Sequence, residues 1–237
     1  MTHGDTLAMT VAATHRSLEE RLGEATSPHR DPSRPREAQA AADMFLAATS
    51  RHIAAVEEVL VGEVRRVVPH AEKLVADYLD AARDLEQILS LVKARVYGEV
   101  HAATLSWSEL CARVRTRFDH HNKLENELVA KLSEHGAPEH SDALARAVFE
   151  AELHAPTRPH PLLPHRGPLG HLARKLFAVA DRFWDAAEGR IIVEPVKPPP
   201  HKHDSLIAQY LVADPKFDDH AELFEHKHRR HPKAEQS

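Results

Sequence analysis

The chain has 237 residues and a formal net charge of −5, from 31 basic and 36 acidic side chains, together with 20 histidines. Its basic residues are spread along the chain and form no broad cationic footprint, so we expect no nucleic-acid partner. No stretch approaches the roughly 18 consecutive apolar residues of a membrane span, so we expect a soluble protein with no membrane partner.

Cysteine usage and the N-terminus indicate the compartment. The only cysteine, Cys111, excludes an intrachain disulfide. Residues 1–20 lack the basic start and apolar core of a signal peptide. Together these features predict a cytoplasmic location.

Proline placement suggests the domain organisation. Most of the 16 prolines lie before Glu37 or after Gly136, which leaves a middle region where helices can run without interruption. We therefore expect an N-terminal extension over residues 1–37, with a short helix and a linker, and a helical bundle over residues 38–154. Residues 155–237 are expected to form a C-terminal extension with one helix and a tail rich in histidine and proline.

The periodicity of apolar residues predicts an all-α protein. Residues repeating at intervals of three and four indicate long helices at about 38–67, 71–97 and 107–135. A fourth bundle helix is supplied either by residues 141–154 or by residues 169–188, and the sequence leaves this choice open. The expected fold is an antiparallel four-helix bundle with an additional C-terminal helix and irregular tails.

The helix at 107–135 has the most informative pattern. Ser106 as N-cap and Glu109 three residues later form a capping-box motif, and Gly136 ends the helix. One face of this helix is expected to be buried: Trp107, Leu110, Val114, Phe118, His121, Glu125, Leu128 and Leu132. For the two later helices the expected faces are Leu144, Val148 and Leu153, and Leu172, Leu176, Val179, Phe183 and Ala187.

Three polar residues occupy positions that the helical period assigns to the buried face: His52, His121 and Glu125. A buried carboxylate is costly unless it is paired or binds a metal ion, and a buried imidazole needs hydrogen-bond partners. His121 and Glu125 are four residues apart, so their side chains share one helical face and can converge on one ion. This donor set suits iron, manganese or zinc, and helical bundles build such centres from inward-facing Glu and His.

The segment RFDHHNKLENELVAKL, residues 117–132, resembles the histidine–histidine–glutamate motif of the hemerythrin-like cation-binding family. SRHIAAVEEVL, residues 50–60, is similar to a ligand-bearing helix of the same family. The resemblance implies a four-helix bundle around one or two non-haem iron ions that binds dioxygen, nitric oxide or peroxide. Carried over by position, it implies His121 and Glu125 as metal ligands, and His52 and Glu57 through the weaker motif.

The remaining ligands are less clear from the sequence. His120, beside His121, is a candidate ligand or a hydrogen-bonding neighbour of the ligands. The helix at 71–97 contains no histidine, so the acids near its inward stripe, Asp77, Asp84 and above all Glu86, are the candidates there. Missing ligands come from His15, His154 or His171, or do not exist.

The sequence is compatible with three functions. The first is an iron protein that binds or senses a small diatomic ligand or peroxide, with turnover left open. The second is a metal-free helical interaction or scaffolding protein, whose apolar segment at residues 205–212 docks on a partner or on a second subunit. A zinc hydrolase is the weakest, because the chain has no HExxH motif and no evident nucleophile-bearing turn.

Overall fold

The computed structural model describes residues 5–27, 35–97, 105–161, 176–183, 185–186, 190 and 192–199. By contacts the chain divides into one compact unit, Met1–Pro199, and a second, Pro200–Ser237. All of the second unit lies outside the described residues, and so does the predicted docking segment at residues 205–212. Within the described residues every regular element is a helix, which confirms the predicted fold class.

Five long helices follow one another along the first unit: α1 (Thr6–Thr26), α2 (Pro35–Val67), α3 (Glu72–Val96), α4 (Trp107–His135) and α5 (Pro138–His154). The bounds of α2, α3 and α4 agree with the predicted helices to within about three residues. The connection at residues 68–71 is too short for anything but an antiparallel pairing of α2 with α3. Among the described helices, none is long and apolar enough to cross a membrane.

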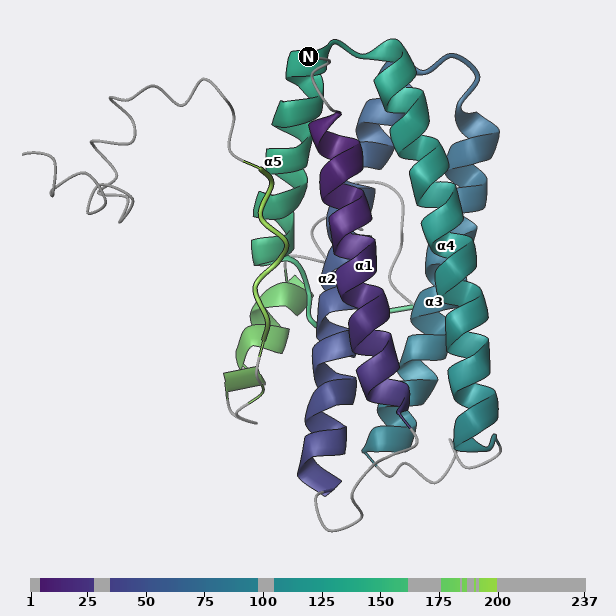
Figure 1. Ribbon diagram of the computed structural model, residues 1–237, viewed down its shortest axis with the longest axis vertical. Coiled ribbons are helices and arrows are strands. Elements are labelled where there is room, and N and C mark those ends of the chain that lie inside the picture. The colour runs from purple at the N-terminus through teal and green to yellow at the C-terminus, as the bar shows by residue number, and fades with distance from the viewer. Residues whose placement is uncertain are drawn as a thin grey trace, which may run out of the picture. The chain divides into compact units, whose positions relative to one another are not determined.

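The bundle is formed by α1, α2, α3 and α4. In Figure 1 these helices lie side by side, and α2 contacts each of the other helices. α1 also contacts α4, and α3 packs extensively on α4, so the ring of four closes. α5 lies outside this ring and packs mainly on α2 and α1. The fourth member is thus α1, from the region that the sequence analysis assigned to an extension, and not either of the two later segments.

The interior is divided into two apolar clusters along the bundle. The first includes Val11, Val56, Tyr78 and Leu128, and the second includes Leu18, Phe45, Leu85 and Phe118. On α1, His15 falls between the residues that belong to the two clusters. His52 on α2 and His121 on α4 fall at the same boundary. A layer of buried polar side chains therefore crosses the bundle part-way along its length.

The ends of α4 follow the expected chemistry. The Ser106 hydroxyl accepts a hydrogen bond from the Glu109 backbone N–H, and the Ser106 N–H donates to the Glu109 carboxylate, so the predicted capping box is confirmed. At Gly136 a Cβ atom would lie 2.8 Å from the Leu132 carbonyl oxygen. Glycine is required there because any side chain would collide with the last turn of α4.

In the segment beyond α5, the buried side chains are not the ones that the sequence predicts. Residues 176–183 and 185–186 are helical, but Leu176, Val179 and Phe183 are 64%, 66% and 68% exposed. Their predicted burial is wrong: the buried residues of this segment include Asp181 and Asp185. Both carboxylates are paired, because Asp181 accepts backbone N–H bonds from residues 157 and 158, and Asp185 accepts a hydrogen bond from Arg190 at 2.6 Å. The hydrogen bonds of these two carboxylates, and not the spacing of the apolar residues, therefore determine which face of the segment is buried.

Candidate metal centre

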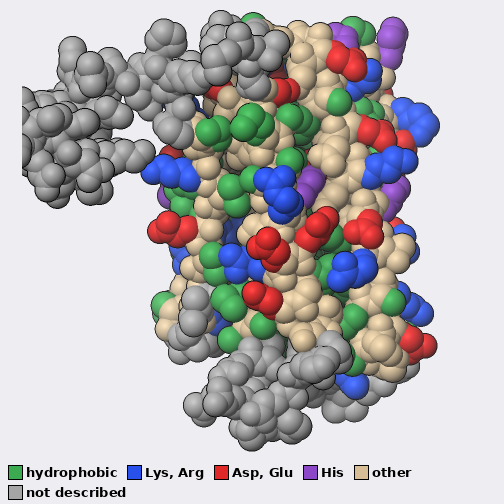
Figure 2. Space-filling view, viewed as in Figure 1, with side chains coloured by type: hydrophobic (Ala, Val, Ile, Leu, Met, Phe, Trp, Pro, Cys, Tyr) green, Lys and Arg blue, Asp and Glu red, His purple; other side chains and the backbone are tan. Residues whose placement is uncertain are grey.

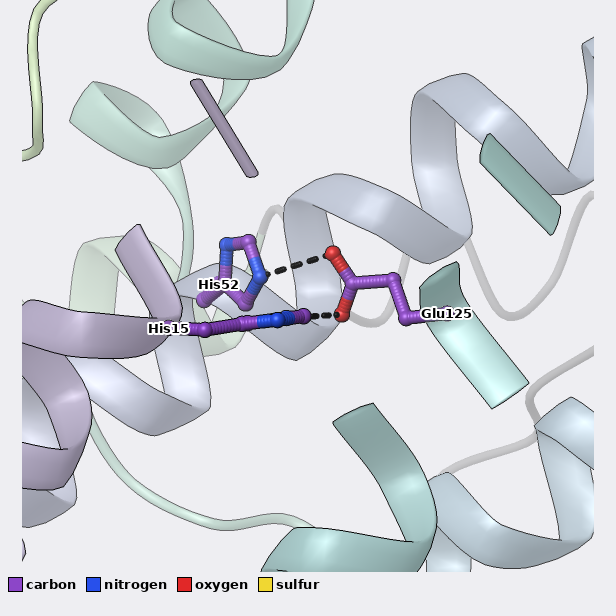
Figure 3. A group of neighbouring side chains, drawn as sticks. All are labelled: His15, His52 and Glu125. Carbon is purple, nitrogen blue, oxygen red and sulfur yellow. Dashed lines mark hydrogen bonds and ion pairs between the residues drawn. The ribbon is translucent and has the colours of Figure 1, made fainter. Parts of the chain in front are cut away.

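Three side chains from three helices converge inside the polar layer. His15 of α1 and His52 of α2 approach the two carboxylate oxygens of Glu125 from α4 (Figure 3). His15 Nε2 lies 3.2 Å from Glu125 Oε2, and His52 Nε2 lies 2.9 Å from Glu125 Oε1. The two imidazole rings stand edge to face, with centroids 5.6 Å apart. One ligand atom from each residue lies within 4.8 Å of the others, so the group can hold a metal ion.

Burial gives these contacts their strength. His52 is 2% exposed and Glu125 is fully buried. Burial by itself would lower the pKa of His52, but the carboxylates of Glu125 and Glu152 outweigh it and raise this pKa to about 10. Burial likewise opposes ionisation of Glu125, yet the neighbouring His52 and His15 hold the Glu125 pKa well below its usual range. In the metal-free chain the group is therefore an imidazolium paired with a carboxylate.

His121 of α4 borders the same group. It is 1% exposed, its Nδ1 atom lies 3.8 Å from Glu125 Oε2, and its ring packs against Tyr78 at a centroid distance of 5.1 Å. Neither ring nitrogen has a hydrogen-bond partner among the described residues. Burial, reinforced by the charges of His52 and His15, lowers the His121 pKa to about 4 despite Glu125. This imidazole is therefore neutral, with Glu125 and Asn122 as its polar neighbours.

A second carboxylate reaches the group from outside the ring of four helices. Glu152 of α5 is buried, and its Oε1 atom lies 2.6 Å from His52 Nδ1. His52 is thus held on both sides, with Glu125 at Nε2 and Glu152 at Nδ1. The neighbouring residue of α2, Arg51, donates from Nε to the backbone carbonyl of Glu152 at 2.7 Å.

The structure sorts the sequence candidates into three sets. His52 and Glu125 are in the converging group, and His121 lies at its edge. Glu57 and Glu86 are buried, each 7% exposed, but the group found among the described residues does not include them. His120 is exposed on α4, away from the buried face.

Among the open candidates for missing ligands, His15 is the one that the structure places in the group. The sequence contains a signal for the burial of His15, because the helical period places it on one face of α1 with Leu7, Val11, Leu18 and Leu22. His154 is exposed and lies 3.0 Å from Arg182, and His171 lies outside the described residues. Glu152 was not considered, although Leu144, Val148 and Glu152 repeat at intervals of four. The predicted member of that face, Leu153, is 36% exposed.

The donor set fits a metal ion on grounds internal to the structure. Two imidazoles and a carboxylate converge in a water-poor layer, and a third imidazole beside them has no hydrogen bond to a described residue. Buried polar atoms nearly always have a hydrogen-bond partner in folded proteins, so ring nitrogens without such a partner at this place indicate a bound group.

Comparison of the chain with known protein families, with curated proteins and with solved structures finds no match.

Proposed function

We propose that this protein binds one non-haem iron ion through His15, His52 and Glu125, and uses it to bind or sense dioxygen, nitric oxide or peroxide. The observation that carries the proposal is the convergence of two imidazole nitrogens and one carboxylate oxygen within 4.8 Å. Two histidines and one carboxylate are the donor set of non-haem ferrous centres that keep open coordination positions. His121 is the nearest further donor.

The resemblance of residues 117–132 and 50–60 to the hemerythrin-like family supports the same proposal. Its strong motif supplies His121 and Glu125, and its weaker motif supplies His52 and Glu57, of which only His52 belongs to the converging group found among the described residues. The absence of a thiolate from the group also favours iron or manganese over a soft metal. Three ligands gathered at one point support a single ion.

In this proposal the residues around the ion have different roles. Glu125 and the two histidines would hold the cation, with Glu125 offsetting part of its charge, while the apolar clusters on either side of the polar layer would exclude water from it. Bound ferrous iron supplies an open coordination position and a ready one-electron couple, which is the chemistry that a small diatomic ligand or peroxide requires. The neutral imidazole of His121 is available as a hydrogen-bonding or ligating group.

A metal-free interaction protein is the second candidate, and one observation favours it. Leu176, Val179 and Phe183 expose apolar surface on neighbouring turns, and exposed apolar patches mark contact sites for other molecules. In that case the buried His and Glu residues serve as a paired polar layer and no metal is bound.

Nitric oxide binding to the ferrous protein tests the first proposal. Protein reconstituted anaerobically with ferrous iron is expected to give the electron paramagnetic resonance signal of a ferrous nitrosyl, at about one spin centre per chain. His15→Ala should abolish most of this signal because it removes one of the three ligands. His120→Ala, at an exposed neighbouring site, should leave it unchanged. An equal signal from His15→Ala and wild type would contradict the assignment of His15.

A further inference from the structure

The shortest side-chain contact of His52 is with a residue that the proposed iron site does not use. Glu152 Oε1 lies 2.6 Å from His52 Nδ1, a shorter contact than the 2.9 Å between His52 Nε2 and Glu125. Both partners are buried, with His52 2% and Glu152 5% exposed. A short contact between a ring N–H and a carboxylate in a dry interior is a strong, charge-assisted hydrogen bond.

Glu152 is itself held in place by the same stretch of α2. Arg51 donates to the Glu152 backbone carbonyl at 2.7 Å, and the next residue, His52, contacts the Glu152 side chain. This carbonyl is in the last turn of α5, where it also accepts a long hydrogen bond of 3.4 Å from the Ala155 backbone N–H. Arg51 also donates to the Val193 carbonyl at 2.9 Å, which ties the segment at residues 192–199 to the same point. Two consecutive residues of α2 therefore fix both the backbone and the carboxylate of Glu152.

We propose that Glu152 is a positioning residue for the metal centre: it accepts a hydrogen bond from the Nδ1–H of His52, which keeps the proton on Nδ1, and so presents the Nε2 lone pair and the plane of the ring to the ion. A neutral imidazole carries its proton on one nitrogen only, so a carboxylate at Nδ1 selects the tautomer whose Nε2 is free to ligate. The same hydrogen bond makes the ring a better donor to a metal. α5, which lies outside the ring of four helices, thereby controls the affinity of the site.

This inference rests on the proposed function. It also assigns Glu152 a role different from that of Glu125. Glu125 faces Nε2 and His15 at once and belongs to the converging group, whereas Glu152 contacts only the far side of the His52 ring in that group. Because the role is to accept a hydrogen bond, a glutamine amide oxygen at position 152 can fill it, whereas an alanine cannot.

The test is the ferrous-iron dissociation constant of the full chain, measured anaerobically by competition with a chelator. Glu152→Ala is expected to weaken iron binding by about 10- to 100-fold, the usual cost of removing such a hydrogen bond. Glu152→Gln should stay within a few-fold of wild type. Glu150→Ala, on an exposed position of α5, is the matched control and should match wild type. In the metal-free chain, nuclear magnetic resonance should show the His52 Nδ1 proton protected from exchange in wild type and in Glu152→Gln.

Each other result has a distinct meaning. Unchanged affinity in Glu152→Ala, with wild type binding iron, overturns the positioning role alone. Equal losses in Glu152→Gln and Glu152→Ala also overturn it, because Glu152 then acts through its charge or as a ligand. If Glu152→Ala does not fold, the Glu152→Gln affinity and the Nδ1 proton decide. Failure of the wild type itself to bind iron overturns the proposed function, and this inference with it.

Discussion

Replacing Glu125 with Leu is expected to lower the free energy of unfolding of the metal-free protein by about 3–5 kcal/mol, the cost of removing one partner from a buried ion pair. Glu125 is fully buried and contacts both His52 Nε2 and His15 Nε2. Without it the His52 imidazolium keeps only Glu152 for a partner. Urea unfolding at pH 7 in the presence of a chelator measures the change.

The matched control is Glu127→Leu on the exposed side of α4, where a surface substitution should change stability by less than about 0.5 kcal/mol. His121→Leu gives a further contrast. Its ring nitrogens have no hydrogen-bond partner among the described residues, so an apolar side chain of similar size should leave stability unchanged or raise it by about 1–3 kcal/mol. A loss below about 1 kcal/mol in Glu125→Leu would show that the pairing around Glu125 does not stabilise the fold.

The stability of the metal-free protein is expected to peak near pH 6.5 and to fall on both sides. His52 has a pKa of about 10 in the folded chain against an ordinary value of 6.5. The folded state therefore binds more protons between these values, and the stability that His52 contributes is full below pH 6.5 and is lost as the pH rises towards 10. The limiting slope for one proton is about 1.4 kcal/mol per pH unit.

On the acid side the sign is reversed by His121. Its pKa is about 4 in the folded chain against an ordinary value of 6.5, so the unfolded state binds the extra proton between these values. Stability then falls as the pH falls from 6.5 towards 4. Glu125, whose pKa is held well below its usual range, contributes stability that is lost at still lower pH. Urea titrations at several pH values measure the profile, and His121→Leu should remove the slope between pH 6.5 and 4. A flat profile from pH 4 to 10 would contradict the described charge states.

The sequence predicted the parts of the fold that depend on local periodicity. Leu110, Val114, Phe118, His121, Glu125, Leu128 and Leu132 were expected on one buried face of α4, and all are buried; Trp107, expected on the same face, is only partly buried. The capping box at Ser106 was also predictable, because it is a contact between residues three apart. His52 and Glu125 were identified because polar residues stood at buried positions of long helices.

The rest depends on contacts between distant segments, which periodicity does not determine. Because a proline-rich linker follows α1, the sequence analysis assigned this helix to an N-terminal extension, although His15 lies on its buried face. Glu152 was missed because the sequence analysis assigned the apolar residue beside it, Leu153, to the buried face. The predicted burial of Leu176 and Phe183 is wrong. Asp181 and Asp185 are buried instead, because both carboxylates are hydrogen-bonded to other parts of the chain.

The metal centre is tested directly by the iron content of chains reconstituted anaerobically with ferrous iron and then freed of unbound metal. Figure 2 shows positive and negative side chains on the described part of the face in view. We expect about one iron per chain in wild type, with a rise in melting temperature as iron is added. Glu125→Leu should retain almost none, and His120→Ala should match wild type. A wild-type chain that holds no iron and whose melting temperature does not change would contradict the metal centre at His15, His52 and Glu125.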